Sequence, residues 1–178
     1  MKRDIKVWDY AGHILEKVGK GVLLTTSAEG KLNTMTIGWG TLGIEWGKPI
    51  FIAFVRESRL TKEMLDKNPE FTVNIPLGEC DPELIKNILS VCGTRSGRDM
   101  DKFAELSLQT EPGQTVSVPG IRQLPLTLEC KVIYRQEQDE SAINQENTKR
   151  YYPKDASQPK GDYHTAYYGQ ITAAYIIE

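Results

Sequence analysis

The sequence contains few of the residues that form disulfides, metal sites and catalytic dyads. Its three cysteines, Cys80, Cys92 and Cys130, are odd in number and include no C-x-x-C pair. They therefore predict neither a disulfide framework nor a zinc site. The two histidines, His13 and His164, have no neighbour at the spacing of a metal site or a local Ser-His-Asp pattern. We predict no metal site in this chain.

Long apolar runs and an excess of charge of one sign are also missing. No stretch approaches the roughly 18 apolar residues of a membrane span, and the first residues lack the apolar run of a signal peptide. The 22 Lys and Arg residues nearly balance the 24 Asp and Glu residues, so neither nucleic acid nor a membrane is expected as a partner. We predict one cytoplasmic domain over residues 1–178 that folds without disulfides.

What the sequence does contain is a series of short β-rich segments separated by turn residues. Glu29-Gly30 predicts a hairpin turn, and Gly169 inside the last segment predicts a bulge or bend. The predicted strands cover residues 22–27, 32–39, 50–55, 71–75, 126–135 and 164–177.

Helices are expected between some of these strands. Asp81-Pro82 is typical of a helix start, and Gly93 is placed where a helix end favours glycine. Because helices and strands do not alternate regularly, we predict a mainly β fold, an antiparallel sheet or β-barrel with a few packed helices. The predicted helices cover residues 58–67, 81–93 and 101–106, with a further helix and loop in the polar stretch 136–161.

One glycine pattern imitates a dinucleotide-binding motif. The run Gly38-Trp39-Gly40-Thr41-Leu42-Gly43 matches G-x-G-x-x-G literally, but that motif requires a helix to begin at its glycines. Residues 44–49, which follow, include Gly47 and Pro49 and do not predict a helix. We therefore reject a Rossmann interpretation. These glycines are expected to permit a bend or the close approach of a flat ligand.

The segment Arg56-Glu57-Ser58-Arg59-Leu60-Thr61 carries the strongest chemical signal. It follows an apolar strand and opens a predicted helix, where unpaired backbone N–H groups and the helix dipole favour an anion. Two arginines and two hydroxyls at this place suit a phosphate. The alternative is that Ser58 caps the helix while both arginines form surface ion pairs.

Two further features have both a functional and a structural interpretation. The loop 93–99 is basic and carries hydroxyl groups, so it would either fold over an anionic ligand or connect two helices. His164, at the start of the last strand, would either face a pocket or lie half-buried with a backbone partner. No role is assigned to His13.

Several segments, taken together and in order, resemble the flavin reductase-like family, which includes flavoredoxins and has the FMN-binding split-barrel fold. The resemblance extends from about Gly21 to the end of the chain. No single motif is specific, whereas the ordered set is. The segments that carry it are Asn33–Trp39, Lys48-Pro49, Arg56–Thr61, Glu70–Asn74, Ser96–Phe103 and His164–Gly169.

This resemblance implies a homodimer with two flavin sites near the subunit interface. It implies that the stretch 33–39 lines the isoalloxazine, that the segment 56–61 binds the phosphate, and that the loop 93–99 closes over the cofactor. His164 matches a histidine near the nicotinamide in some reductase members and is the catalytic candidate. The implied cofactor-binding residues are Asn33, Met35, Thr36, Ile37, Gly38, Trp39, Arg56, Ser58, Arg59, Thr61, Arg95 and Ser96.

The leading functional hypothesis is an oxidoreductase that binds FMN, in preference to FAD, and accepts electrons from NADH or NADPH. The acceptor would be free flavin, a ferric chelate or a protein. One alternative is a flavin-bearing electron carrier of the flavoredoxin type without nicotinamide activity, and another is a barrel that binds a ligand other than flavin. Two departures from the family pattern, the polar stretch before Gly161 and Tyr163 beside His164, bear on which donor reaches the flavin.

Overall fold

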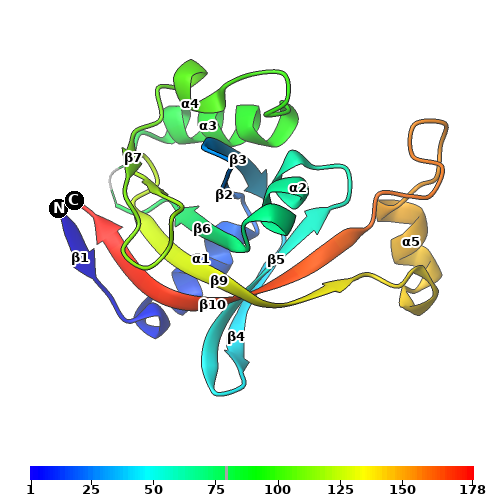
Figure 1. Ribbon diagram of the computed structural model, residues 1–178, viewed down its shortest axis with the longest axis horizontal. Helices are drawn as coiled ribbons and strands as arrows, with labels where there is room; N and C mark the ends of the chain where they lie inside the picture. The colour runs from blue at the N-terminus through cyan, green and yellow to red at the C-terminus, as the bar shows by residue number, and fades with distance from the viewer. Residues whose placement is uncertain (79) are drawn as a thin grey trace.

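The computed structural model describes residues 1–78 and 80–178, and an antiparallel sheet forms its centre (Figure 1). A small second sheet pairs β7 (Thr110–Glu111) with β8 (Gly120–Ile121). The main sheet consists of β1 (Lys2–Asp4), β2 (Val22–Ala28), β3 (Lys31–Ile37), β4 (Gly40–Glu45), β5 (Lys48–Arg56), β6 (Glu70–Ile75), β9 (Leu126–Glu137) and β10 (His164–Ile177).

The strand order leaves the main sheet open. Seven strands pair in the order β3-β2-β6-β9-β10-β5-β4. Strand β1 pairs with residues 175–177 of β10, beyond residues 164–170 that pair with β5. Within the described chain, the outer strands β3 and β4 do not pair with each other. This arrangement is a split barrel, and the predicted fold is confirmed.

Two tight hairpins join neighbouring strands. Glu29 (φ 51°) and Gly30 (φ 76°) connect β2 to β3, and Trp46 (φ 50°) and Gly47 (φ 67°) connect β4 to β5. Positive φ at both central residues is the type I′ geometry, which matches the twist of antiparallel strands. The predicted turn at Glu29-Gly30 is confirmed. Trp46 is unusual, because a bulky side chain rarely adopts a positive φ.

Strand β10 bends where the sequence predicted a bulge. Its register against β9 shifts between Tyr168 and Gly169, and again between Ile171 and Ala173. A Cβ atom at Gly169 would lie only 2.4 Å from the ring of Phe71. Glycine therefore lets β10 pass close to the core side of β6, and the predicted bulge at Gly169 is confirmed.

Helices cover parts of this sheet. Asp81 accepts hydrogen bonds from the N–H groups of Glu83 and Leu84, as predicted for the start of the second long helix. Among the described residues, no helix combines the length and the apolar character needed to span a membrane. The helices are α1 (Ala11–Val18), α2 (Leu60–Lys67), α3 (Pro82–Thr94), α4 (Lys102–Glu105) and α5 (Gln145–Tyr151), with 3-10 turns at Val7–Tyr10 and Glu140–Ala142.

The core has two parts that meet at β2. Phe51, Phe71 and Tyr167 are fully buried at the centre of the larger cluster, which fills the inside of the sheet. A smaller cluster lies between the sheet and α3 and includes Leu23 and Ile88. Strand β3 is thereby held between the core and α3, and its end is fixed in position.

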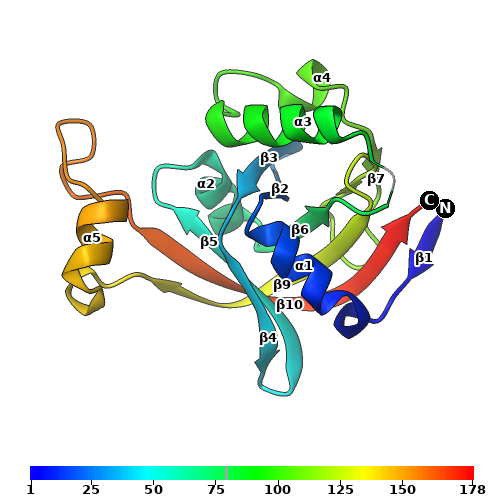
Figure 2. The same ribbon diagram turned by 180° about the vertical axis from the view of Figure 1, so that it is seen from behind.

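The ends of β9 and β10 extend away from the body and carry the polar stretch, which we call the arm (residues 138–163). The arm contains α5 and projects to one side in Figures 1 and 2. The predicted helix and loop between the last two strands are thus observed. The arm returns to the body at its C-terminal end, where His164 begins β10 beside Arg56 of β5.

Three expectations need correction. Residues 40–45 form the edge strand β4, although their glycines were expected to give a bend. Strand β3 ends at Ile37, so Gly38 and Trp39 belong to the connection between β3 and β4. Helix α2 begins at Leu60, and its N-cap is Arg59, without a side-chain cap. Ser58 is therefore not the helix cap that was considered.

Candidate functional site

Two adjoining cavities bring together all of the site residues proposed from the sequence. They share Met35, Thr36 and Arg59. The aromatic cavity, about 180 Å³, is lined by Met35, Thr36, Ile37, Gly38, Trp39, Phe54, Arg56, Arg59 and His164. The cationic cavity, about 170 Å³, is lined by Asn33, Met35, Thr36, Ser58, Arg59, Leu60, Thr61, Cys92, Gly93, Arg95, Ser96, Gly97, Arg98 and Lys102.

The cationic cavity is strongly biased toward anions. Four of its lining side chains carry a positive charge, and none of its described lining residues is an aspartate or glutamate. These cations come from the start of α2, the loop after α3 and the start of α4. Positive charge gathered in a concave site concentrates anions, and phosphate is the ligand that such donors suit best.

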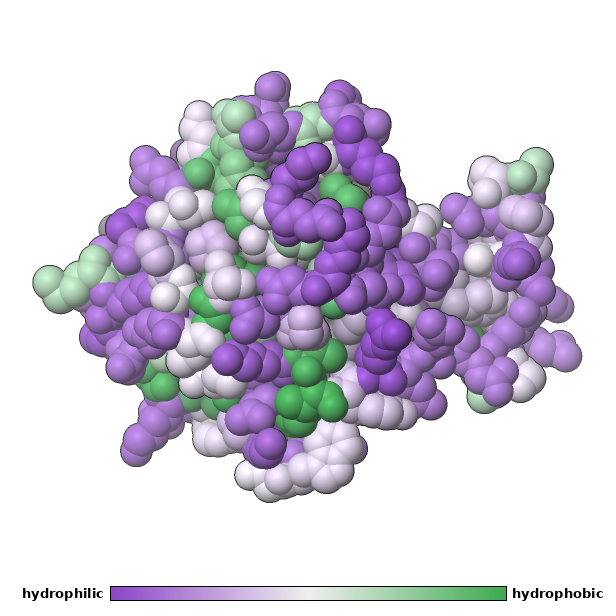
Figure 3. Space-filling view, in the orientation of Figure 1, coloured by the Kyte–Doolittle hydropathy of each residue, from purple (hydrophilic) through white to green (hydrophobic). Residues whose placement is uncertain are grey.

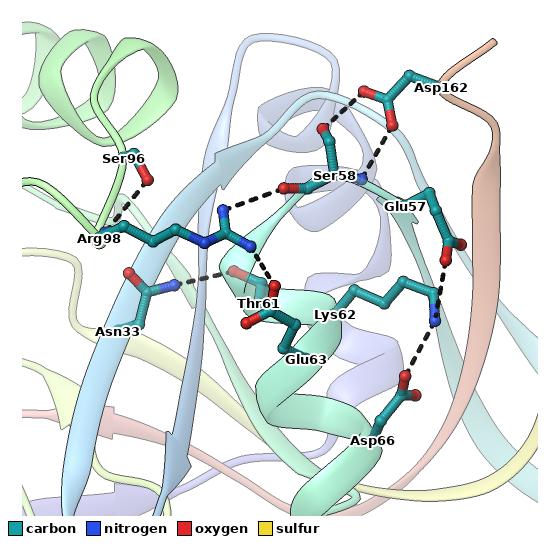
Figure 4. Close-up of polar contacts among 10 residues, drawn as sticks. All are labelled: Asn33, Glu57, Ser58, Thr61, Lys62, Glu63, Asp66, Ser96, Arg98 and Asp162. Atoms are coloured by element: carbon teal, nitrogen blue, oxygen red, sulfur yellow. Dashed lines mark hydrogen bonds and ion pairs between the residues drawn. The ribbon is translucent and has the colours of Figure 1, made fainter. Parts of the chain in front are cut away.

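The arginines of this cavity differ in whether they already have a partner. Arg98 forms an ion pair with Glu63 and donates a hydrogen bond to the carbonyl of Ser58 at 3.1 Å (Figure 4). The side chains of Arg59 and Arg95 are exposed and make no hydrogen bond or ion pair with residues 1–78 or 80–178. Their guanidinium groups are therefore the ones available to a ligand.

A buried hydroxyl lies beside these cations. Thr61 is 1% exposed, and its Oγ1 accepts a hydrogen bond from Nδ2 of Asn33 at 2.9 Å. The hydroxyl proton of Thr61 is then left for another acceptor. The loop passes very close at this point, because a Cβ at Gly97 would lie 2.1 Å from Oδ1 of Asn33. Gly97 thus lets the loop pack directly on Asn33.

Lys102 belongs to this site and was missed by sequence reasoning. Its side chain is 4% exposed, and Nζ donates to the carbonyl oxygens of Thr34 at 2.8 Å and Cys92 at 3.1 Å. Burial lowers the pKa of Lys102 and raises the pKa of the Cys92 thiol to about 11. The motif 96–103 was recognised as a segment, but nothing in the residue pattern showed that this lysine points inward.

The aromatic cavity has a different character. The Trp39 ring lies 4.8 Å from the His164 ring at 37°, and the edge of Tyr151 meets Trp39 at 5.1 Å. Met35 and Ile37 pack against the apolar core beneath. Flat ring surfaces above apolar side chains suit a planar aromatic ligand. The arm contributes to this wall through Tyr151.

His164 is buried and neutral. It is 7% exposed, and its Nδ1 lies 2.9 Å from the hydroxyl of Tyr152. Burial, followed by the nearby charge of Arg56, lowers the pKa of His164 from 6.5 to about 4. At neutral pH its imidazole therefore takes part in hydrogen bonding without a charge. His164 lines the aromatic cavity, and the partner of its ring is a side chain of the arm, not the backbone group considered from the sequence.

Two residues expected on the phosphate side are used to fasten the arm. Both oxygens of the Asp162 carboxylate bind Ser58, one at the backbone N–H (2.9 Å) and one at the hydroxyl (2.8 Å) (Figure 4). Arg56 donates to the carbonyl oxygens of Asp162 at 2.9 Å and Tyr151 at 3.0 Å. In this structure, Ser58 and Arg56 line the cleft, but their donors already have partners.

A larger cavity lies elsewhere. It has a volume of about 670 Å³ between α1 and α3, and of the proposed cofactor residues only Thr36 reaches it. Its lining mixes apolar residues such as Leu77 and Leu89 with Lys17 and Lys86. Those lysines have glutamate neighbours on their own helices, Glu16 and Glu83, at 3.9 and 3.7 Å. The smaller cleft has the denser set of unpaired cations and ring surfaces, so we assign the functional site there.

The family model described as "Flavin reductase like domain" matches residues 15–178. The chain belongs to this family, and the resemblance inferred from the sequence is confirmed.

Solved structures and a sequence relative agree with this assignment. Flavoredoxin of Methanosarcina acetivorans is 25% identical with a TM-score of 0.66, and the match covers 89% of this chain and 68% of that one. An FMN-binding domain of a flavin reductase-like enzyme from Shewanella baltica is 14% identical with a TM-score of 0.66, covering 99% and 77%. An uncharacterized protein of Archaeoglobus fulgidus is 30% identical over 110 residues, 62% of this chain but only 59% of that relative.

Proposed function

We propose that this protein binds FMN and passes electrons from NADH or NADPH through the flavin to an acceptor. The observation that carries this proposal is the cleft itself, which has unpaired cations at one end and contacting aromatic rings at the other. Membership of the flavin reductase-like family supports the same chemistry. Free flavin, a ferric chelate or a protein would serve as the acceptor.

The cleft fits a flavin mononucleotide in its donor set. Arg59, Arg95 and Lys102 would hold the phosphate, together with the hydroxyl of Thr61, because charged donors make the stronger hydrogen bonds to an anion. The ring would lie toward Trp39, where Gly38 and Trp39 sit between β3 and β4, outside both ladders. Ser96 and Asn33 line the space between the two ends.

The chemistry divides between the cofactor and the chain. A bound flavin supplies the ring that accepts the hydride, so no side-chain base is required. The chain's part is to bind the phosphate, orient the ring and limit the access of water. His164 acts as the catalytic residue by contacting the donor through a neutral imidazole, which adds no charge beside Arg56.

A second candidate is an electron carrier of the flavoredoxin type. It is favoured by the contact of Tyr151 with Trp39, because this part of the arm narrows the approach of a nicotinamide to the ring. The similarity to a flavoredoxin supports the same alternative. In that case another protein would reduce the flavin.

Two measurements test these proposals in sequence. The absorbance spectrum of the protein reconstituted with FMN shows whether flavin binds. If no bound-flavin spectrum is seen, only the hypothesis of a barrel that binds another ligand is left. Anaerobic mixing with NADH and NADPH then separates the two flavin hypotheses. Bleaching by a nicotinamide supports the oxidoreductase, whereas bleaching by dithionite alone supports the carrier.

The preference for FMN over FAD rests on the cationic cavity. FAD carries a second phosphate and an adenosine, and the cleft shows one cluster of unpaired cations, at Arg59 and Arg95. Cofactor released by heat from the holoprotein and separated on a column should be mainly FMN. Recovery of FAD as the main species contradicts the proposal.

We also propose that the protein is a homodimer. Apolar and aromatic side chains are exposed beside the β4–β5 hairpin, including Ile44, Trp46, Ile133 and Tyr134. Trp46 of the β4–β5 turn and Tyr134 of β9 contact each other edge to face, with 6.1 Å between the ring centroids. Figure 3 shows hydrophobic and weakly polar residues gathered at the lower edge, where Figure 1 places β4. Such a patch is typical of a surface that is covered in the assembled protein.

A further inference from the structure

The base of the arm holds a chain of hydrogen bonds that ends on His164. Gln138 follows β9 and lies opposite His164, the first residue of β10, with its N–H donating to the His164 carbonyl at 3.0 Å. Tyr152 follows α5 and is buried, with its hydroxyl 2.9 Å from Nδ1 of His164. Both residues come from the stretch that had no role in the predicted site.

The direction of the first hydrogen bond is fixed by the backbone. The N–H of His164 is a donor, and it meets Oε1 of Gln138 at 3.1 Å. Because the amide oxygen is occupied in this way, the amide nitrogen of Gln138 is the group left to face Tyr152. The side chain of Gln138 opposes the rise in the pKa of Tyr152 that burial causes. That is the effect of a donor on a phenol.

The remaining directions then follow. Among the described residues, Nδ1 of His164 is the one acceptor within hydrogen-bond distance of the Tyr152 hydroxyl, so the phenol proton is directed to it. An imidazole that accepts at Nδ1 carries its proton on Nε2 when it is neutral. Among residues 1–78 and 80–178 there is no hydrogen-bond partner for Nε2, and His164 lines the aromatic cavity.

We propose that Gln138 and Tyr152 are positioning residues that hold His164 in the Nε2–H tautomer, so that it presents a hydrogen-bond donor to the ligand of the aromatic cavity. The ligand atom would be an acceptor, such as a carbonyl oxygen of the donor or of the flavin. This inference rests on the proposed function for the identity of the ligand. The tautomer itself is a property of the protein alone.

The charged groups around His164 leave this arrangement in place at neutral pH. Arg56 on the adjacent strand and Arg59 at the start of α2 disfavour the imidazolium, whereas Asp162 on the arm favours it more weakly than burial opposes it. Trp39 covers one face of the ring. The neutral ring therefore has two tautomers to choose between, and the contact with Tyr152 decides which is populated.

The test is imidazole nitrogen NMR on protein labelled with ¹⁵N-histidine. Only two histidines are present, so His13→Gln assigns both signals. In the wild-type protein, free of ligand at pH 7, His164 should show the Nε2–H tautomer. Tyr152→Phe removes the donor to Nδ1 and should lower the ratio of Nε2–H to Nδ1–H by roughly five- to tenfold. The matched control Tyr151→Phe changes the neighbouring ring and should leave the ratio unchanged.

A second variant reverses the direction of the hydrogen bond between Tyr152 and His164 without removing an aromatic ring. Gln138→Glu keeps an acceptor for the His164 N–H but presents a second acceptor to Tyr152. The tyrosine proton should then turn to the carboxylate, and His164 should change to the Nδ1–H tautomer. A wild-type His164 in the Nδ1–H form, or no change of tautomer in a folded Gln138→Glu protein, overturns the proposal.

The same samples separate this inference from the proposed function. Titration with FMN, followed by NADH under anaerobic conditions, should show FMN affinity unchanged and flavin reduction slowed in Tyr152→Phe. If FMN fails to bind to the wild-type protein, the proposed function is wrong, whatever the tautomer. If FMN binds and is reduced while the tautomer is Nδ1–H, the positioning role is wrong and the function stands.

Discussion

Among single residues, the cations of the cleft divide into those that hold the fold together and those that have no protein partner. Arg56 fastens the arm, and Arg98 is paired with Glu63. Arg59 and Arg95 line the same cavity without such contacts. A charged group without a protein partner can bind an anion without first breaking a hydrogen bond. We therefore propose the unpaired arginines as the phosphate ligands.

Replacing Arg59 with alanine should therefore weaken FMN binding with little effect on the fold. Loss of a charge-assisted hydrogen bond costs about 1.5–3 kcal/mol, or roughly 10- to 150-fold in the dissociation constant. Quenching of flavin fluorescence measures this constant. Arg122→Ala, which removes an arginine paired with Glu111 outside the cleft, is the matched control. An unchanged constant in Arg59→Ala would show that this arginine is only a surface residue.

His164 should make the stability of the protein depend on pH in a defined direction. Its pKa is lowered from 6.5 to about 4 in the folded chain, so the unfolded chain takes up the proton first as the pH falls. The contribution of the neutral histidine to the free energy of unfolding is fully present above pH 6.5 and is lost as the pH falls toward 4. The full effect is roughly 3 kcal/mol in the free energy of unfolding.

Urea unfolding at pH 7 and pH 4.5 measures this effect as a difference between variants. Carboxylates elsewhere also titrate, so the comparison is with His164→Gln, which should lose less stability than the wild-type protein over the same interval. His13→Gln is the control and should lose as much as the wild-type protein. Parallel losses in all three proteins would contradict the shifted pKa of His164.

At the scale of secondary structure, the arm is held to the body at a few points near its base. Asp162 binds Ser58 through two hydrogen bonds, and Arg56 reaches two carbonyl oxygens of the arm. The outer part of the arm is mostly exposed. Its position over the cleft is therefore set by these polar contacts together with the ring contacts of Tyr151 and Tyr152 at the base, and single substitutions there should loosen it.

Asp162→Ala should loosen the arm without unfolding the sheet. It removes the acceptor of two hydrogen bonds, so local opening around Ser58 should increase roughly tenfold. Hydrogen exchange of peptides from residues 56–60 and 138–163 measures this opening, while exchange in β6 and β9 should remain slow. Asp155→Ala, which removes a carboxylate that contacts only its own turn, is the control. Equal exchange in both variants would show that Asp162 does not fasten the arm.

The sequence predicted most elements because their signals are local. The turn at Glu29-Gly30, the cap at Asp81 and the bulge at Gly169 each depend on a few adjacent residues, and each was found. Strand β4 was missed because its two glycines weaken the strand pattern. The type I′ turn after it was missed because Trp46 is a rare residue at positive φ.

The sequence led to a set of site residues that the fold brings together, but it did not show their contacts. All of the proposed residues line the cleft, because the ordered family pattern places them there. The contact of Ser58 with Asp162 joins residues 104 positions apart, and no local spacing encodes it. The inward direction of Lys102 depends on two backbone carbonyls of other elements. Tertiary packing alone determines such contacts.

At the scale of the whole molecule, the hairpin β4–β5 ends in a feature that costs local stability. Trp46 is held at φ 50° and is 59% exposed, although asparagine or glycine suits this turn position better. A bulky side chain that adopts a positive φ and is still mostly exposed in its own chain is explained if a partner chain buries it. The neighbouring Ile44, Ile133 and Tyr134 are exposed as well, and together they form the surface assigned to the homodimer.

Trp46→Asn should separate folding from assembly, because it creates the Asn-Gly pair that the type I′ turn prefers. The free energy of unfolding at low protein concentration should be equal to or higher than that of the wild-type chain. The dimer should weaken by about 2 kcal/mol or more for each lost tryptophan, as expected for an aromatic anchor at an interface. Light scattering over a dilution series should give twice the chain mass for the wild-type protein and a shift toward one chain mass for the variant. Leu84→Asn, which changes an exposed residue of α3 on the opposite side of the molecule from β4 (Figures 1 and 2), should leave the dimer intact. A monomeric wild-type protein would refute the dimer, and an unchanged dimer in Trp46→Asn would place the interface on another face.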